Sequence, residues 1–315
     1  MIQRAHQKSL AVLDAIGNTP LVELRRVVPK GAARVVIKIE GANPTGSMKD
    51  RVARAMVNAA IADGRLTPGG TVVEYTGGST GVSLALVCAA LGYKCCLVSS
   101  DAFSDEKLNA MRAFGAELTL VRSDNKKLNA ELFRAMIAKA DEMSRQPGHW
   151  FCDQLKNADA AAGYHGLGDE MWTQSGGRID GFVQAVGTAH SLHGTSAALR
   201  RHNASLHVVA VEPAESAVIA GKPPGSHRIE GIGTGFVPAL FRRDQVSEMD
   251  AVSTDDANAM ARRLAREEAV FAGTSTGANV IAAIRVAQKL GSGATVGTIA
   301  IDSGLRYLST DVFTF

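Results

Sequence analysis

The sequence predicts an α/β protein of two doubly wound, open-sheet domains. Strand-like and helix-like segments alternate along most of the 315 residues, and a parallel strand connection needs a helix that covers the sheet. The length corresponds to two domains at about 150 residues each. The 32 glycines, more than the usual share of about 7%, indicate several tight turns at which a ligand can approach the backbone.

The first part of the chain alternates regularly between the two kinds of segment. We expect strands, rich in apolar and β-branched residues, at 34–40, 71–75, 94–100 and 116–121. We expect helices, with apolar residues three and four positions apart, at 47–63, 81–91, 104–114 and 129–144. The turn sequence Gln146-Pro147-Gly148 then marks the boundary between an N-terminal domain, 1–147, and a C-terminal domain, 148–315.

The second part repeats the alternation around one irregular segment. Strands are expected at 149–153, 181–187, 206–213 and 295–302. Helices are expected at 158–173, 190–202, 255–268 and 277–290. Residues 214–250, which include Lys222-Pro223-Pro224-Gly225, show no clear periodicity and are interpreted as a functional or interface loop.

Composition and charge exclude several classes of protein. Lys and Arg number 34 against 31 Asp and Glu, so the net charge of +3 does not indicate a nucleic-acid partner. The longest apolar segment, 82–91, is too short to cross a bilayer, and residues 1–17 lack the apolar core of a secretory signal. The four cysteines form no C-x-x-C pattern and are expected to be buried, reduced thiols. We therefore expect a cytoplasmic protein without a membrane partner.

Four glycine-containing turns are candidate ligand sites, because ligands of doubly wound sheets bind at the carboxyl ends of strands. They lie at 76–81, 187–191, 231–235 and 273–277. The first two lead directly into expected helices, whose free N–H groups and dipole favour a phosphate or a carboxylate. No G-x-x-x-x-G-K-[ST] sequence occurs, and 231–235 lacks the flanking strand and helix of a dinucleotide-binding fingerprint, so a nucleotide is not expected.

Metal and serine-hydrolase chemistry are not indicated either. His190 and His193 are three residues apart on one helical face, but no third ligand is nearby in the sequence, so no metal site is expected. The G-x-S-x-G turn of the α/β-hydrolases is also missing from the sequence.

The strongest chemical signal is Lys49, within Asn43-Pro44-Thr45-Gly46-Ser47-Met48-Lys49-Asp50-Arg51. The lysine lies in the first turn of an expected helix, directly after a strand and a turn. The positive end of the helix dipole disfavours an ammonium there and promotes the neutral amine that a Schiff base requires.

These motifs resemble those of the cysteine synthase and cystathionine β-synthase group of fold type II pyridoxal 5′-phosphate (PLP) enzymes, whose fold is tryptophan synthase β-like. The resemblance runs from Ile16-Gly17-Asn18-Thr19-Pro20-Leu21 through the Lys49 motif and Gly231-Ile232-Gly233-Thr234-Gly235-Phe236 to Arg306-Tyr307-Leu308-Ser309-Thr310. It implies a β-replacement on an O-activated L-serine through an α-aminoacrylate intermediate, with sulfide or a related nucleophile, in amino-acid biosynthesis. It also implies a homodimer, movement of region 46–147, and packing of residues 13–34 on the C-terminal domain.

The resemblance also assigns roles to individual residues. Lys49 would hold PLP and move the substrate α-proton, and Ser275 would bind the pyridine nitrogen. The phosphate would lie in a loop of Gly187, Thr188, Ala189, His190 and Ser191. Ser79 would face the 3′-oxygen of PLP, and the amino-acid carboxylate would be bound by Thr76, Gly77, Thr80 and Gln154. A neutral hydroxyl on the pyridine nitrogen makes PLP a weaker electron sink, which favours β-elimination and β-replacement over transamination.

Two of these loops depart from the family pattern. Gly77 stands in place of a serine and Ser79 in place of an asparagine, which removes one carboxylate donor. In the phosphate loop, Gly-Thr-Gly-Gly-Thr has become Gly-Thr-Ala-His-Ser, and we expect His190 to be charged beside a dianion.

The departures leave two alternatives open. A β-elimination lyase would release pyruvate and ammonia from serine, cysteine or a related amino acid, because a weaker grip on the carboxylate exposes the intermediate to water. A catalytically inactive PLP-binding protein is the third hypothesis. The amino-acid donor, the nucleophile and any regulatory partner stay open at this point.

Overall fold

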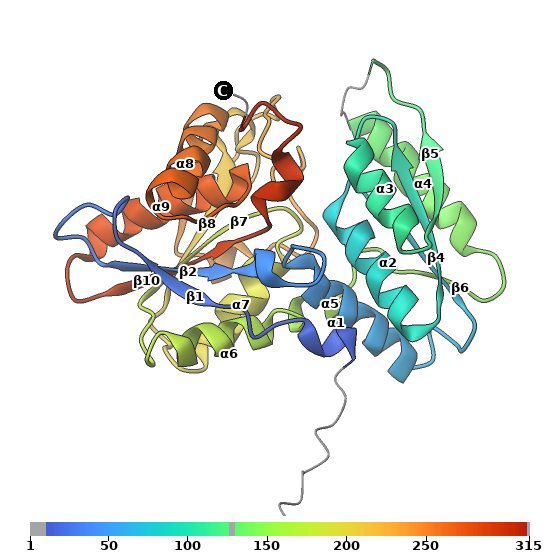
Figure 1. Cartoon of the computed structure of the whole chain (residues 1–315), viewed down its shortest axis with the longest axis horizontal. Coiled ribbons are helices and arrows are strands. Elements are labelled where there is room, and N and C mark those ends of the chain that lie inside the picture. The colour runs from blue at the N-terminus through green and yellow to red at the C-terminus, as the bar shows by residue number, and fades with distance from the viewer. Residues whose placement is uncertain (1–10, 126–129, 314–315) are drawn as a thin grey trace, which may run out of the picture.

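The computed structural model describes residues 11–125 and 130–313 and contains two open α/β sheets that lie side by side (Figure 1). The six-stranded sheet has the order β1 (Leu21–Leu24), β2 (Arg34–Ile39), β10 (Thr295–Ala300), β7 (Gly181–Ala185), β8 (His207–Pro213) and β9 (Glu248–Val252). The four-stranded sheet has the order β5 (Glu117–Val121), β4 (Lys94–Ser100), β3 (Thr71–Tyr75) and β6 (His149–Phe151). Every pairing is parallel except that of β1 with β2, which confirms the predicted fold class.

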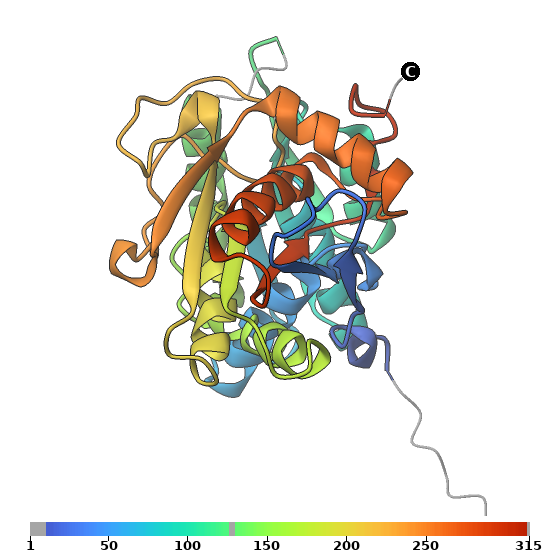
Figure 2. The same ribbon diagram turned by 90° about the vertical axis from the view of Figure 1, so that its left-hand side faces the viewer.

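Helices cover both faces of each sheet, as parallel strands require. On the larger sheet, α8 (Thr254–Glu267) and α9 (Thr274–Leu290) lie on one face, whereas α6 (His165–Gln174) and α7 (His190–Arg200) lie on the other (Figure 1, Figure 2). The smaller sheet lies between α2 (Ser79–Leu91) with α3 (Asp105–Ala113) and α4 (Ala130–Ser144). Helix α1 (Lys49–Ala62) packs between the two parts, against α2 and against the short α5 (Asp159–Ala162).

Several element boundaries differ from the sequence predictions. The expected helix at 158–173 is split into α5 and α6, and β1 and β9 were not predicted as strands. Between α5 and α6, a Cβ atom on Gly163 would lie 3.0 Å from the backbone oxygen of Arg51, so glycine allows the close approach of this segment to α1. Strand β6, after the expected boundary at 147, pairs with β3 in the smaller sheet, whereas β1 and β2 belong to the larger sheet. Residues 1–10 and Asn129, which the sequence analysis also covered, lie outside the described part.

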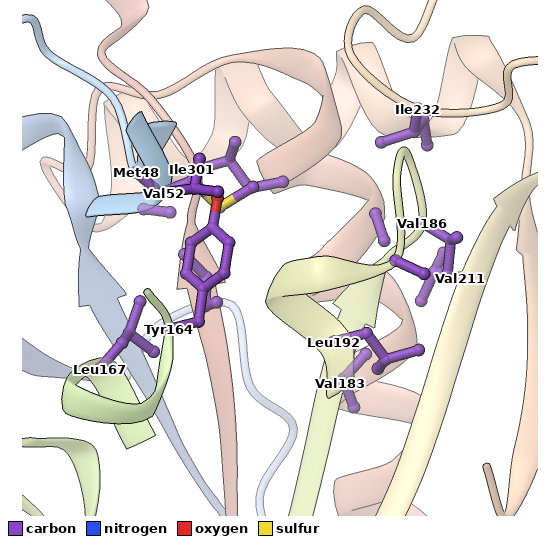
Figure 3. Close-up of a cluster of buried hydrophobic side chains, with 14 of the residues drawn as sticks. Met48, Val52, Tyr164, Leu167, Val183, Val186, Leu192, Val211, Ile232 and Ile301 are labelled. Carbon is purple, nitrogen blue, oxygen red and sulfur yellow. The ribbon is translucent and has the colours of Figure 1, made fainter. Parts of the chain in front are cut away.

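The hydrophobic core anchors the start of α1. Met48 and Val52 pack with Tyr164 and Ile301 in the main buried cluster, which extends into both sheets (Figure 3). Because each of these side chains is nearly inaccessible to water, the turn that precedes α1 is fixed by packing rather than by local propensity. Among the described helices, none is both long and apolar enough to span a membrane.

A buried network of charges joins α1 to the larger sheet. The Arg51 guanidinium donates to both carboxylate oxygens of Glu40 at 2.7 and 2.8 Å and to both oxygens of Glu170 at 2.8 Å. Lys38 lies 2.7 Å from Glu170, and the Thr19 hydroxyl donates to Glu40 at 2.6 Å. Ion pairing lowers the pKa of Glu170 to about 2, although desolvation acts in the opposite direction. The Glu170 carboxyl therefore stays ionised at physiological pH.

We predict that Arg51→Ala lowers the free energy of unfolding by about 3–5 kcal/mol, because it leaves the Glu40 carboxylate buried without its cation. Thermal unfolding followed by circular dichroism measures this effect. The matched control is Arg65→Ala, whose exposed ion pairs with Asp63 and Asp159 contribute little. Equal losses for the two variants would contradict the prediction.

Candidate active site

Lys49 is the first residue of α1 and follows the carboxyl end of β2. The turn before it is hydrogen-bonded to the segment after β10: Met48 N–H donates to the Ile301 carbonyl at 3.0 Å, and Ser303 N–H donates to the Gly46 carbonyl at 2.9 Å. Gly46 has a φ of 79°, a conformation that favours glycine. The turn thus holds Lys49 at the strand ends, where the fold places ligands.

The Lys49 amine has a pKa lowered to about 8. Burial is the largest cause, and the nearby Asp302 carboxyl acts in the opposite direction. The direction agrees with the sequence prediction, but the dominant cause is desolvation rather than the helix dipole. Asp302 is itself buried, accepts a hydrogen bond from the Tyr307 hydroxyl at 2.9 Å, and has a raised pKa because of desolvation.

The expected phosphate loop, 187–191, turns directly into α7. A Cβ atom on Gly187 would lie 2.4 Å from the Gly231 carbonyl oxygen, so only glycine at this position allows the 231–235 turn to pack against the loop. Ala189 has a left-handed φ of 70° immediately before the helix. The loop therefore presents the N-terminus of an eleven-residue helix, a favourable place for an anion.

His190, the first residue of α7, lies buried in this loop. Its pKa is lowered to about 3, first by burial and then by the Lys49 and His193 charges. Its Nδ1 lies 2.9 Å from the Thr188 hydroxyl. Desolvation and neighbouring positive charge both disfavour the protonated form here, and the charged imidazole expected beside a phosphate dianion stays a prediction.

Ser275 lies in the first turn of α9, which begins at Thr274, so the 273–277 turn also opens a helix. The Ser275 hydroxyl is buried and has no hydrogen-bond partner among the described residues. The next residue, Thr276, accepts from Ile301 N–H at 3.1 Å. Since Ile301 also binds Met48, the start of α9 and the Lys49 turn meet at the end of β10.

The expected carboxylate loop, 76–81, is organised by Thr76. Its hydroxyl accepts from the N–H groups of Gly78 and Gly81, both at 3.1 Å, so this side chain is engaged inside the loop. Thr80 instead donates to the Gln154 side-chain oxygen at 2.8 Å. The structure thus brings together two of the predicted substrate residues that are 74 positions apart in the sequence.

The two departures in this loop are matched by neighbouring side chains. A Cβ atom on Gly77 would lie 2.6 Å from the Phe103 ring, which occupies the space of the family's serine. Ser79 accepts from Arg306 Nη1 at 2.8 Å, while Arg306 Nη2 donates to the Thr45 carbonyl at 2.6 Å. Phe103 and Arg306 were not predicted as site residues. For Arg306 the available signal was its place in the Arg-Tyr-Leu-Ser-Thr motif.

Comparison with known proteins identifies the family. A model described as pyridoxal-phosphate dependent enzyme matches residues 12–302. The chain belongs to this PLP-dependent enzyme family. It is 40% identical over 307 residues to a cysteine synthase of Staphylococcus aureus, covering 96% of this chain and 97% of the relative.

Solved structures agree with this assignment. The crystal structure of a cysteine synthase from Entamoeba histolytica has a TM-score of 0.91 and 35% identity, covering 99% of this chain and 93% of that one. A hydrogen sulfide-producing enzyme from Fusobacterium nucleatum has a TM-score of 0.88 and 30% identity, with coverage of 95% and 100%. The chain is therefore a PLP-dependent, cysteine synthase-like enzyme.

The polar groups of the site fit this cofactor. Ser275 supplies a buried hydroxyl that lacks a partner among the described residues, which suits the pyridine nitrogen. The loop at 187–191 supplies a helix N-terminus for the phosphate. Lys49 supplies an amine whose lowered pKa suits covalent attachment.

We predict that Gly77→Ser, which restores the family's serine, destabilises the protein by about 1–3 kcal/mol, because the new side chain overlaps the Phe103 ring. The test is a double-mutant cycle of Gly77→Ser, Phe103→Ala and the double variant, followed by thermal unfolding. Alanine at position 103 should remove the overlap with the new serine, so the double variant should lose less stability than the sum of the two single variants. As a control, Gly166→Ser adds the same side chain where the nearest neighbouring atom is 4.0 Å away. Additive losses in the cycle would contradict this explanation of Gly77.

Proposed function

We propose that this enzyme catalyses β-replacement on O-acetyl-L-serine, with sulfide as the simplest nucleophile. The observation that carries the proposal is the buried, low-pKa amine of Lys49 at the strand ends, near an anion-binding helix N-terminus. The cysteine synthase names of the relatives from Staphylococcus aureus and Entamoeba histolytica support the same reaction.

Each group of site residues has a separate role in this reaction. PLP, when bound, withdraws electrons from the substrate α-carbon. Lys49 holds the cofactor and then takes the proton from that carbon, for which a pKa of about 8 is suitable. The Ser275 hydroxyl binds the pyridine nitrogen. Backbone N–H groups of residues 187–191 bind the phosphate.

The substrate carboxylate would bind at the start of α2. The helix N-terminus offers backbone N–H groups there, and the Thr80 and Gln154 side chains lie next to each other. Because Gly77 contributes no hydroxyl, recognition rests more on backbone donors and on Gln154 than in the family pattern. Ser79, held by Arg306, lies beside the same helix start.

A β-elimination lyase is the second candidate. Two observations favour it: the missing hydroxyl at Gly77, and the likeness to a hydrogen sulfide-producing enzyme of Fusobacterium nucleatum. Assays of the purified enzyme with O-acetyl-L-serine or L-cysteine, with and without added sulfide, distinguish β-replacement from β-elimination. Cysteine formation from O-acetyl-L-serine supports replacement, whereas pyruvate formation as the main reaction supports the lyase.

We further propose a cytoplasmic homodimer in which region 46–147 moves on substrate binding. The four cysteines are free and buried, which suits a reducing compartment. The two separate sheets support movement of the smaller sheet, whereas the Arg51 ion pairs hold the start of α1 on the larger one. The homodimer rests on the family resemblance alone and is tested by light scattering of the purified protein.

We predict that Lys49→Ala lowers kcat by at least about 10²–10⁴-fold, because the proton at the α-carbon loses its acceptor. The absorbance of the bound cofactor should also change, since its attachment to the lysine is lost. An exposed lysine in the irregular loop, Lys222→Ala, serves as the control. Steady-state turnover at the wild-type rate in Lys49→Ala would contradict the assignment.

A further inference from the structure

Glu74 is a buried carboxyl that the proposed mechanism does not use. It lies in β3, one residue before the strand ends, and its side chain is inaccessible to water. No Lys or Arg among the described residues forms an ion pair with it. A buried carboxylate without a cation is costly, so its presence at this strand end calls for a specific role.

Two backbone N–H groups compensate this carboxyl. Glu74 Oε1 accepts from Tyr75 N–H at 3.1 Å, and Glu74 Oε2 accepts from Gln154 N–H at 3.0 Å. The second bond crosses from β3 to the turn after β6. The residue before Gln154, Asp153, has a left-handed φ of 45°, a conformation that aspartate adopts more readily than most residues. Glu74 therefore bonds to the turn at the residue that follows this change of chain direction.

The same turn aims the Gln154 side chain. Its oxygen accepts from Thr80, and its nitrogen donates to the Tyr75 carbonyl at 3.1 Å. With the bond to Glu74, the backbone and the side chain of Gln154 are both tied to the strand and helix that flank the carboxylate loop. Glu74 thus contacts the residues on both sides of the loop, Tyr75 before it and Gln154 across from it.

We propose that Glu74 is a positioning residue for the amino-acid substrate: its carboxyl group holds the turn at Asp153 and thereby fixes Gln154 for the substrate α-carboxylate. This inference rests on the proposed function, which takes Gln154 as a carboxylate ligand. It assigns a role in recognition to a residue that contacts neither the substrate nor the cofactor.

A second buried carboxyl provides a matched control. Glu212, in β8 of the other sheet, accepts from the N–H groups of Ile219 and Ala220 at 2.8 and 2.9 Å. Burial raises its pKa, as it does that of Glu74. Glu212→Gln therefore imposes the same chemical change as Glu74→Gln without touching Gln154.

The test uses the PLP-loaded enzyme and measures the Kd of O-acetyl-L-serine, and of L-cysteine, from the cofactor absorbance. In Glu74→Gln the amide offers an acceptor to only one of the two N–H groups, so we expect a Kd about 3- to 10-fold higher. Glu212→Gln should leave the Kd unchanged. Amide hydrogen exchange without substrate should be faster at residues 152–156 in Glu74→Gln alone.

The double variant shows whether Glu74 acts through Gln154. We expect the Kd of Glu74→Gln/Gln154→Ala to equal that of Gln154→Ala alone. Additive increases, or an unchanged Kd in Glu74→Gln while Gln154→Ala weakens binding, would overturn the proposal. An unchanged Kd in Gln154→Ala would overturn both it and the assigned carboxylate ligand. If O-acetyl-L-serine leaves the spectrum unchanged but L-cysteine binds, the proposed donor fails and the Glu74 test proceeds.

The pH dependence of the substrate Kd distinguishes a role of the Glu74 charge from a purely structural role. Burial, with a contribution from Asp153, raises the pKa of Glu74 to about 8, while the pKa values of its neighbours Cys152 and Tyr75 are shifted well upward. The ionised carboxylate accepts the Gln154 N–H more strongly than the neutral acid. The wild-type Kd should therefore fall as pH rises through 8, relative to Glu74→Gln, which lacks this ionisation. Parallel pH profiles would overturn the role of the charge.

Discussion

The bidentate ion pairs of Arg51 are the constraint on which the site depends. This residue is two positions after Lys49 on α1, and its guanidinium is held by Glu40, directly after β2, and by Glu170 on α6. The fork geometry of a guanidinium fixes direction as well as distance. The first turn of α1 therefore cannot rotate or slide on the larger sheet without breaking bonds to buried charges. The Arg51 ion pairs therefore also fix the position of Lys49, two residues earlier in the same turn.

The smaller sheet is connected to the same turn by different bonds. The Asp50 carboxylate accepts from the hydroxyls of Thr45 and Ser83, both at 2.6 Å, and Ser83 belongs to α2. Arg306 then bridges Ser79, at the start of α2, to the Thr45 carbonyl. Consecutive residues of α1 thus face different parts of the protein, Asp50 toward α2 and Arg51 toward the larger sheet. The Lys49 turn is the point at which the two parts are held in register.

The carboxylate loop shows how side chains lost from a family pattern can be compensated by neighbours. Phe103 fills the space next to Gly77, so the loop keeps its shape but loses a polar donor. Arg306 donates to the Ser79 hydroxyl and to the Thr45 carbonyl, so the start of α2 is bonded to the turn before α1. The hydroxyl that the family pattern has at position 77 is missing from the loop. In the proposed function, the orientation of Gln154 therefore contributes more to recognition of the carboxylate.

The parts predicted from the sequence are those that local pattern determines. Strands β3 and β4 were predicted with their observed bounds, because continuous runs of apolar and β-branched residues are typical of strands buried on both faces. Strands β1 and β9 are half exposed at the sheet edges and lack that pattern. The break at Gly163 and the contact between Arg306 and Ser79, 227 positions apart, depend on tertiary packing that no sequence window contains. Lys49 was predicted as a site residue because its motif is local, whereas the desolvation that lowers its pKa depends on tertiary packing.

Burial has two opposite outcomes in this protein, and pairing decides between them. Where buried charges meet partners, as at Arg51 and Glu170, the ionised forms are stabilised and the groups become fixed framework. Where partners are missing or neutral, as at Lys49 and Glu74, the same desolvation moves the pKa of each group to about 8. Only the second kind can exchange protons near physiological pH. Charge pairs thus hold α1 in place, while Lys49 and Glu74, the groups with pKa values near 8, lie at strand ends, the edge at which ligands of this fold bind.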